Sequence, residues 1–196
     1  MWMIDETRNP WTVLSTEEVY ANSWLTVHEH KVVTPTGTRG IYGVISPRKL
    51  AIGVVPFTPS GEIVLVGQFR FPLKRYSWEI PEGGGDMSVP PQESAARELA
   101  EETGYSAKGW QEILQMDLSN SVSDERAISF IAWDLEAGDA APDETEELAL
   151  RLVRFKDALD MVLTGAITDA ITVTSLLKVQ VLAARGALPE PVLRAL

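Results

Sequence analysis

The segment ESAARELAEETGY at residues 93–105 has the composition of a helix that stops at a glycine. Ala, Leu, Glu and Arg, all good helix formers, fill the interval between Pro90–Pro91 and Gly104. Proline suits the opening positions of a helix, and glycine suits the position just beyond its end. The sequence therefore predicts a helix over about residues 91–103.

Three glutamates of this helix share one face. Glu98, Glu101 and Glu102 stand at i, i+3 and i+4, which places their carboxylates within one turn of each other. Like charges at this spacing destabilise an isolated helix by a few tenths of a kcal/mol. A solvated acidic surface tolerates that cost, whereas a hard cation such as Mg2+ between the carboxylates removes the repulsion. Spacing alone leaves both interpretations open.

The length, composition and net charge of the chain exclude several kinds of site and binding partner. The chain has 196 residues, 45% hydrophobic residues, a formal net charge of -11 and no cysteine. The length favours one main domain, and the lack of cysteine excludes disulfides, thiolate catalysis and Cys-ligated zinc. Because binding a phosphate backbone depends on Lys and Arg, we expect no nucleic-acid partner. No apolar run approaches roughly 20 residues and the start lacks a signal-peptide layout, so we expect a cytoplasmic protein that binds no membrane.

Apolar patterns predict strands on both sides of the helix. Residues 24–33, WLTVHEHKVV, alternate as a strand, and TPTGTRG turns the chain into IYGVIS, which predicts a hairpin. The β-branched runs 51–57 and 63–67 flank the turn composition TPSGE, and we expect them to pair as core strands. The segments EILQMDLSN and AISFIAWDLE have strand character as well.

The C-terminal part changes to helical periodicity. FKDALDMVLTG and DAITVTSLLKVQVLAARG have apolar residues at helical spacing and end at Gly165 and Gly186, which predicts two closing helices. The acid-rich residues 136–148, EAGDAAPDETEEL, lack periodicity and are expected to form a loop. The layout predicts an α+β fold, a mixed sheet with a few helices, preceded by a small N-terminal sheet.

A run of three glycines lies in the sequence shortly before the predicted helix and its acidic face. Gly83–Gly85 allow backbone conformations closed to other residues and a close approach to a ligand or ion. From Gly83 through RELAEETGY at residues 97–105, the spacing resembles the Nudix box, G-x5-E-x7-R-E-U-x-E-E-x-G-U, where U is apolar. IVLVGQFRFPLKRYSWEIPEGG, SDERAISFIAWDLEAG and TGAITDAITVTSLLK are similar to segments of the ADP-ribose and nucleotide-sugar pyrophosphatase branch.

The resemblance implies a fold and an activity. We expect a Nudix-type α/β/α sandwich with a mixed sheet as the catalytic domain at residues 49–196, and an antiparallel β-sheet region for dimerisation at residues 1–48. The activity would be Mg2+- or Mn2+-dependent hydrolysis of the diphosphate bond of ADP-ribose or a related NDP-sugar, giving a nucleoside monophosphate and a sugar phosphate. A homodimer is implied. The alternative is a Nudix-fold nucleotide-sugar binding module or sensor without hydrolysis, against which the intact box acids argue.

Roles for individual residues follow from the same resemblance. The implied metal ligands are the backbone carbonyl of Glu82 and the side chains of Glu98, Glu101, Glu102 and Glu146. The implied catalytic residues are Arg97, Glu101, Glu125 and Glu144. Arg97 would hold the box acids by ion pairing. Glu144 is the better candidate for general base, and its order with Glu146 is left open because both lie in the acidic loop DETEE.

The substrate side is implied for Gln68, Arg70, Glu79 and Trp24. A guanidinium such as that of Arg70 suits a phosphate or a base. Trp24, Phe71 and Trp78 could stack on a base, but aromatic residues in strands more often belong to a core.

Three features limit the resemblance. Val89 stands where the box carries Glu, so we expect the local structure before the helix to differ. Asn120 lies near a position where ADP-ribose hydrolases typically carry proline, which leaves other nucleotide sugars open as substrates. His28 and His30 share one strand face, yet no further ligand lies nearby in the sequence, so a structural role is favoured over a metal pair.

Overall fold

The computed structural model describes residues 7–141 and 147–196, and these form two compact units. The N-terminal unit contains the chain up to Arg48 together with Asp117–Glu125. The larger unit contains Lys49–Met116 and Arg126–Leu196. The acids Glu144 and Glu146 of the predicted loop therefore lie outside the described residues.

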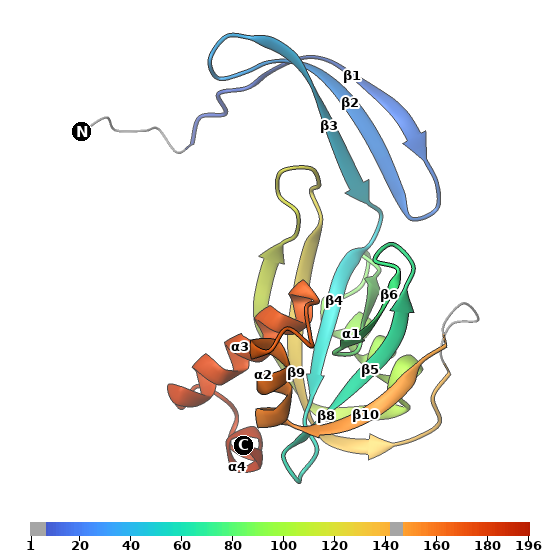
Figure 1. Ribbon diagram of the computed structural model, residues 1–196, viewed down its shortest axis with the longest axis vertical. Helices are drawn as coiled ribbons and strands as arrows, with labels where there is room; N and C mark the ends of the chain where they lie inside the picture. The colour runs from blue at the N-terminus through green and yellow to red at the C-terminus, as the bar shows by residue number, and fades with distance from the viewer. Residues whose placement is uncertain (1–6, 142–146) are drawn as a thin grey trace. The chain divides into compact units, whose positions relative to one another are not determined.

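The N-terminal unit is an antiparallel sheet of β1 (Thr12–Ala21), β2 (Leu25–Val33) and β3 (Arg39–Pro47), in that order (Figure 1). Asn22 forms the first turn, because its Oδ1 accepts hydrogen bonds from the backbone N–H groups of Trp24 and Leu25. The predicted hairpin corresponds to β2 and β3. β1 was not predicted, and all ten of its residues are exposed.

The larger unit holds two sheets. The mixed sheet has the order β7-β4-β9-β8, in which β4 runs parallel to β9 and antiparallel to β7. The second sheet has the order β10-β5-β6 and is antiparallel. The strands are β4 (Leu50–Pro56), β5 (Glu62–Arg70), β6 (Arg75–Glu79), β7 (Glu82–Gly85), β8 (Tyr105–Asp117), β9 (Arg126–Ala137) and β10 (Ala149–Arg154).

Helices cover both faces of the mixed sheet (Figure 1). Helix α1 (Pro91–Thr103) packs through Leu99 against Ile52 and Phe130. Alternate residues face the other way, where Ser129 of β9 bonds Ser175 of α3 (Ala170–Ala184) at 2.7 Å between their Oγ atoms. Helices α2 (Phe155–Leu163) and α4 (Glu190–Ala195) complete the unit. This arrangement is the predicted α+β sandwich.

Local signals predicted the helix bounds well. The predicted helix at 91–103 is α1, and Gly104 after it has φ 74°, the left-handed conformation that glycine adopts without strain. α2 and α3 correspond to the two predicted closing helices, each followed by a glycine of positive φ. The third closing helix, α4, was not predicted.

The two β-branched runs do not pair with each other, so that prediction was wrong. β4 lies between β7 and β9, whereas β5 lies between β10 and β6, and only an isolated bridge joins Phe57 to Ile63. β5 is the central strand of its sheet and β4 is an inner strand of the mixed sheet. Both strands are therefore buried over most of their length. The turn composition located the turn correctly, but the chain crosses there from one sheet to the other.

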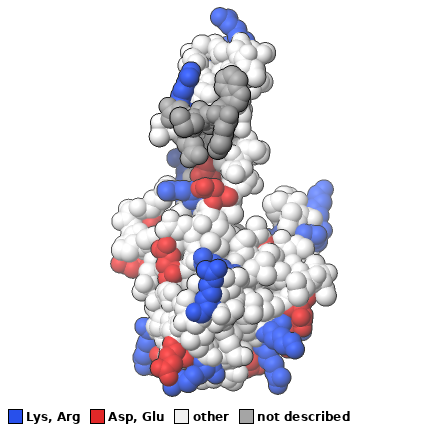
Figure 2. Space-filling model, turned by 90° about the vertical axis from the view of Figure 1, so that its left-hand side faces the viewer, with Lys and Arg blue, Asp and Glu red and all other residues white. Residues whose placement is uncertain are grey.

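Charged side chains of both signs are interspersed over the larger unit on the face drawn in Figure 2. Small groups of Lys and Arg alternate there with Asp and Glu. Among the described residues, no helix is long and apolar enough to cross a membrane.

Candidate active site

Helix α1 carries two buried carboxylates beside its apolar contact face. Glu98 is 8% exposed and Glu102 3%, and Leu99 and Ala95 of the same helix are fully buried. Glu101 is more exposed, with 41% of its side chain accessible. Exposed Glu93 in the first turn does not belong to this group. The acidic face therefore consists of two buried acids and one at its edge.

Gly83 allows β7 to approach the Glu98 carboxylate. A Cβ placed on Gly83 would lie 2.3 Å from the Glu98 carboxyl carbon and 2.3 Å from Oε2, distances that real Cβ atoms do not tolerate. Glycine at this position lets the Glu98 carboxylate stay where it lies, and a larger residue would displace it. The backbone before the helix and the first glutamate of the face are thus in direct contact.

Hydrogen bonds fix the positions of the acids. The backbone N–H of Glu82 donates to Glu102 Oε2 at 3.0 Å. Arg97 donates from Nη2 to Glu98 Oε1 at 2.6 Å and to the Gly84 carbonyl at 3.0 Å, and from Nη1 to Glu101 Oε2 at 2.5 Å. These contacts connect β7 and α1, and they preorganise the acidic face.

Arg97 also stays charged in this setting. Burial disfavours the cation, but the carboxylates of Glu98 and Glu101 outweigh it and raise the pKa of Arg97. The side chain is 44% exposed, so its ion pairs act mainly by orientation and contribute little to stability.

The donor set of this face fits a divalent cation. Two buried carboxylates on one side of a helix are hard oxygen ligands of the kind that Mg2+ and Mn2+ prefer. Burial of like charges is costly unless they are paired or coordinate a metal. Glu98 and Glu102 are the residues that would hold such an ion.

A second group of charged residues lies at the junction of β6 and β7. Arg70 at the end of β5 donates from Nε to both oxygens of Glu79, at 3.0 and 2.9 Å, and from Nη2 to Glu82 Oε1 at 2.6 Å. Nη2 also forms an ion pair with Glu79 Oε2. Burial opposes the charge of Arg70, but Glu79 and Glu82 raise its pKa. Arg70 is therefore an anchored cation.

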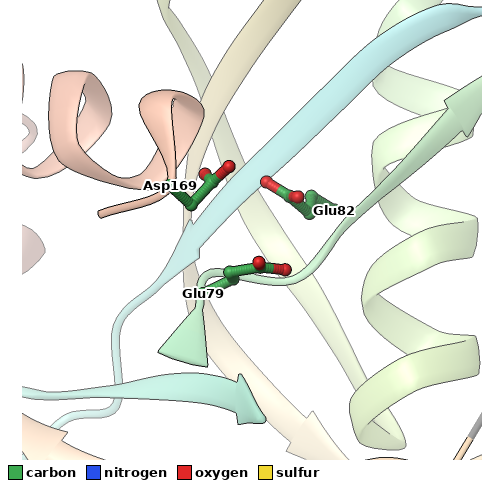
Figure 3. Close-up of side chains that lie close together, drawn as sticks. All are labelled: Glu79, Glu82 and Asp169. Carbon is green, nitrogen blue, oxygen red and sulfur yellow. The ribbon is translucent and has the colours of Figure 1, made fainter. Parts of the chain in front are cut away.

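Asp169 completes this second group from a distant part of the chain. It is the N-cap of α3, where its Oδ2 accepts the Thr172 N–H at 2.7 Å. One oxygen each from Glu79, Glu82 and Asp169 lies within 4.8 Å of the others (Figure 3). Burial, followed by the charges of Asp169 and Glu79, raises the pKa of Glu82 well above its usual range.

The sequence did not indicate this second group as a unit. Asp169 was missed, and at position 82 only the backbone carbonyl was considered. An Asp before a helical pattern is a recognisable cap signal, but nothing local to residue 169 shows that it faces Glu82.

The remaining predicted residues are dispersed. Gln68 lies on β5 opposite Ser77. Trp24 and Glu125 belong to the N-terminal unit, Trp24 with 72% of its surface exposed, and burial raises the pKa of Glu125. Val89 lies in the turn before α1, where its N–H donates to the Asp86 carbonyl at 3.3 Å.

Comparison with known protein families identifies the family of this chain. The NUDIX domain matches residues 47–174, and the "Nucleoside diphosphate sugar hydrolase N-terminal domain" matches residues 11–45. The chain belongs to the Nudix family. The prediction of a Nudix hydrolase is thereby confirmed.

Two bacterial relatives resemble this Nudix chain over most of its length. The "ADP-ribose pyrophosphatase" of Bacillus subtilis is 31% identical over 161 residues, which are 81% of this chain and 86% of the relative. The protein of the same description from Mycobacterium tuberculosis is 29% identical over 185 residues, which are 91% and 87% of the two chains.

A solved structure shares the Nudix fold. The "Crystal structure of ADP compounds hydrolase" matches with a TM-score of 0.81 at 22% identity, covering 91% of this chain and 97% of the other. The predicted fold class is thereby confirmed.

Proposed function

We propose that this Nudix hydrolase cleaves the diphosphate bond of ADP-ribose or a related nucleoside diphosphate sugar, giving a nucleoside monophosphate and a sugar phosphate. The observation that carries the proposal is the pair of buried carboxylates, Glu98 and Glu102, held on α1 by Arg97 and by the Glu82 N–H. The names of the Bacillus and Mycobacterium relatives support this substrate class.

Mg2+ or Mn2+ is the proposed cofactor, held by Glu98 and Glu102 with Glu101 at the edge of the site. The bound ion would neutralise phosphate charge and lower the pKa of a water molecule. The chain itself orients the two carboxylates, through Arg97 on Glu98 and the Glu82 N–H on Glu102. The Glu82 carbonyl is a further proposed ligand, adjacent to the glycine that contacts Glu98.

Water activation is assigned by family resemblance to the loop acids and Glu125. Glu144 remains our candidate for general base and Glu146 for a loop metal ligand, and both lie outside the described residues. Burial raises the pKa of Glu125 above its ordinary value, and a carboxylate so shifted is a stronger base.

The substrate side is proposed to include Gln68, Arg70, Glu79 and Trp24. Among these, Arg70 has the best-defined geometry, because Glu79 and Glu82 hold its Nε and Nη2. Because Glu79 and Glu82 already fix this guanidinium, its remaining donors can bind a phosphate with little further loss of side-chain entropy.

A homodimer is proposed through the N-terminal sheet. Val13, Leu14, Val19 and Tyr20 of β1 are all more than half exposed, as is Ile41 of β3. Apolar side chains in such number on one short sheet favour a protein partner over solvent.

The substrate class is tested by incubating pure protein with Mg2+ and a panel of NDP-sugars that includes ADP-ribose, and by detecting nucleoside monophosphate chromatographically. We expect release of monophosphate that depends on the divalent ion. Calorimetric binding of a panel member without any product would instead establish the binding-module alternative.

A further inference from the structure

The carboxylates of Glu79, Glu82 and Asp169, here called the acidic trio, converge in the larger unit. They come from the end of β6, the start of β7 and the N-cap of α3. Figure 3 shows the Glu82 and Asp169 carboxylates facing each other, with Glu79 beside them. One oxygen from each acid lies within 4.8 Å of the other two, a separation that a single ion can span.

One oxygen of the acidic trio has no partner. Glu82 Oε2 is buried and is the only side-chain N or O atom, among the described residues, that is buried without a hydrogen-bond partner. Asp169 faces this oxygen, and the two acids can share a hydrogen bond only when one of them carries a proton, as the raised pKa of Glu82 allows. A buried acceptor without a donor is costly, so this oxygen requires either that shared proton or a bound cation.

Charge balance favours a divalent ion over a single shared proton. Arg70 is the cation that contacts the trio among the described residues, through Glu79 and Glu82. Three carboxylates and one guanidinium leave a net charge of -2. One proton would reduce this only to -1 in a buried setting, whereas one divalent cation would neutralise it.

The trio is also preorganised for a cation. Arg70 orients Glu79 and one oxygen of Glu82, and the Thr172 N–H orients Asp169. A carboxylate has about four acceptor positions, so these bonds leave capacity on each acid for an ion. We propose that Glu79, Glu82 and Asp169 form a second divalent-cation site, distinct from the carboxylates of Glu98 and Glu102 on α1.

The experiment measures Mn2+ binding by calorimetry and by electron paramagnetic resonance of free Mn2+, without substrate. The background is the full chain carrying Glu98→Gln and Glu102→Gln, which removes the α1 carboxylates. In this background we compare Asp169→Asn with the matched control Asp157→Asn, an exposed acid in the first turn of α2. Asn is as good an N-cap as Asp, so α3 keeps its cap.

We expect the background protein and the Asp157→Asn control to bind one Mn2+ with similar affinity. Asp169→Asn should weaken this binding at least about tenfold, and Glu82→Gln, which should not affect the α3 cap, should do the same. Circular dichroism of each metal-free variant checks that it is folded. The absence of Mn2+ binding in the folded background, or binding unchanged by both trio substitutions, would overturn the proposal. The result does not depend on whether the chain hydrolyses any nucleotide sugar.

Discussion

Residue 82 serves two neighbouring groups of acids through different atoms. Its backbone N–H holds Glu102 of α1, while its side chain enters the acidic trio with Glu79 and Asp169. The next residue, Gly83, lies so close to the Glu98 carboxylate that a side chain there would displace it. Two adjacent positions at the start of β7 therefore decide how the carboxylates of the larger unit are arranged.

Gly83→Ala tests the close approach of β7 to Glu98. The added Cβ would fall 2.3 Å from the Glu98 carboxylate, so that side chain or the strand must move. Because the displaced Glu98 carboxylate is a proposed metal ligand, we expect kcat/KM on the preferred NDP-sugar to fall at least about tenfold. Gly43→Ala is the control, because a Cβ there meets nothing within 4 Å. Wild-type activity in Gly83→Ala would contradict the account.

Residue types and spacing could predict the box acids but not their surroundings. Glu98, Glu101 and Glu102 are ordered by helix periodicity, which is a local property. Asp169 reaches Glu82 only because α3 packs on the sheet that contains β4, and no local pattern carries that information. The metal and catalytic roles of the individual acids remain predictions.

Helix α1 is positioned by its apolar face. Leu99 is fully buried and packs with Ile52 of β4 and Phe130 of β9. In the sequence, Leu99 follows Glu98 and precedes Glu102, the two buried glutamates. The same contacts that stabilise the unit therefore set the direction in which Glu98 and Glu102 point.

Leu99→Ala tests this coupling of packing and site geometry. Loss of a fully buried leucine should reduce the unfolding free energy by about 2–5 kcal/mol, measured by denaturant titration with circular dichroism. Leu177→Ala on α3, where the side chain is 43% exposed, should cost less than about 1 kcal/mol. Equal costs for the two substitutions would show that α1 is not anchored as described.

Element bounds were more predictable than element pairing. α1 matched because Pro90–Pro91 are a local start signal and Gly104 a local stop signal, and Gly165 and Gly186 are stop signals of the same kind. β4 and β5 are both β-branched and close in sequence, yet each takes its partners from distant strands. Pairing depends on long-range contacts, so a turn between two strands does not establish that they form a hairpin.

The outer strand of the N-terminal sheet, β1, exposes the apolar side chains of Val13, Leu14, Val19 and Tyr20. β1 is an edge strand with paired neighbours on one side only. Edge strands with apolar side chains are prone to pair with another chain, which fits the proposed homodimer.

Val13→Glu tests the dimer. Val13 is 55% exposed and lines a cavity of the N-terminal unit with Trp11, His30 and Val32. In light scattering after size exclusion, we expect the wild-type chain at twice 21.6 kDa and Val13→Glu shifted toward the monomer, because a charge in an apolar interface must be desolvated. Glu17→Gln on the same strand should leave the mass unchanged. A monomeric wild-type protein would refute the dimer.

The most direct test of the central claim is the kcat/KM of Glu102→Gln with Mg2+ and the preferred NDP-sugar. Gln keeps the size and one acceptor for the Glu82 N–H but removes the charge, so we expect a loss of about 100- to 1000-fold with the fold retained, as suits the loss of several kcal/mol of transition-state stabilisation. Glu93→Gln, on the exposed first turn of the same helix, should keep wild-type activity. Activity of Glu102→Gln within about twofold of wild type would contradict the assignment of these buried carboxylates to catalysis.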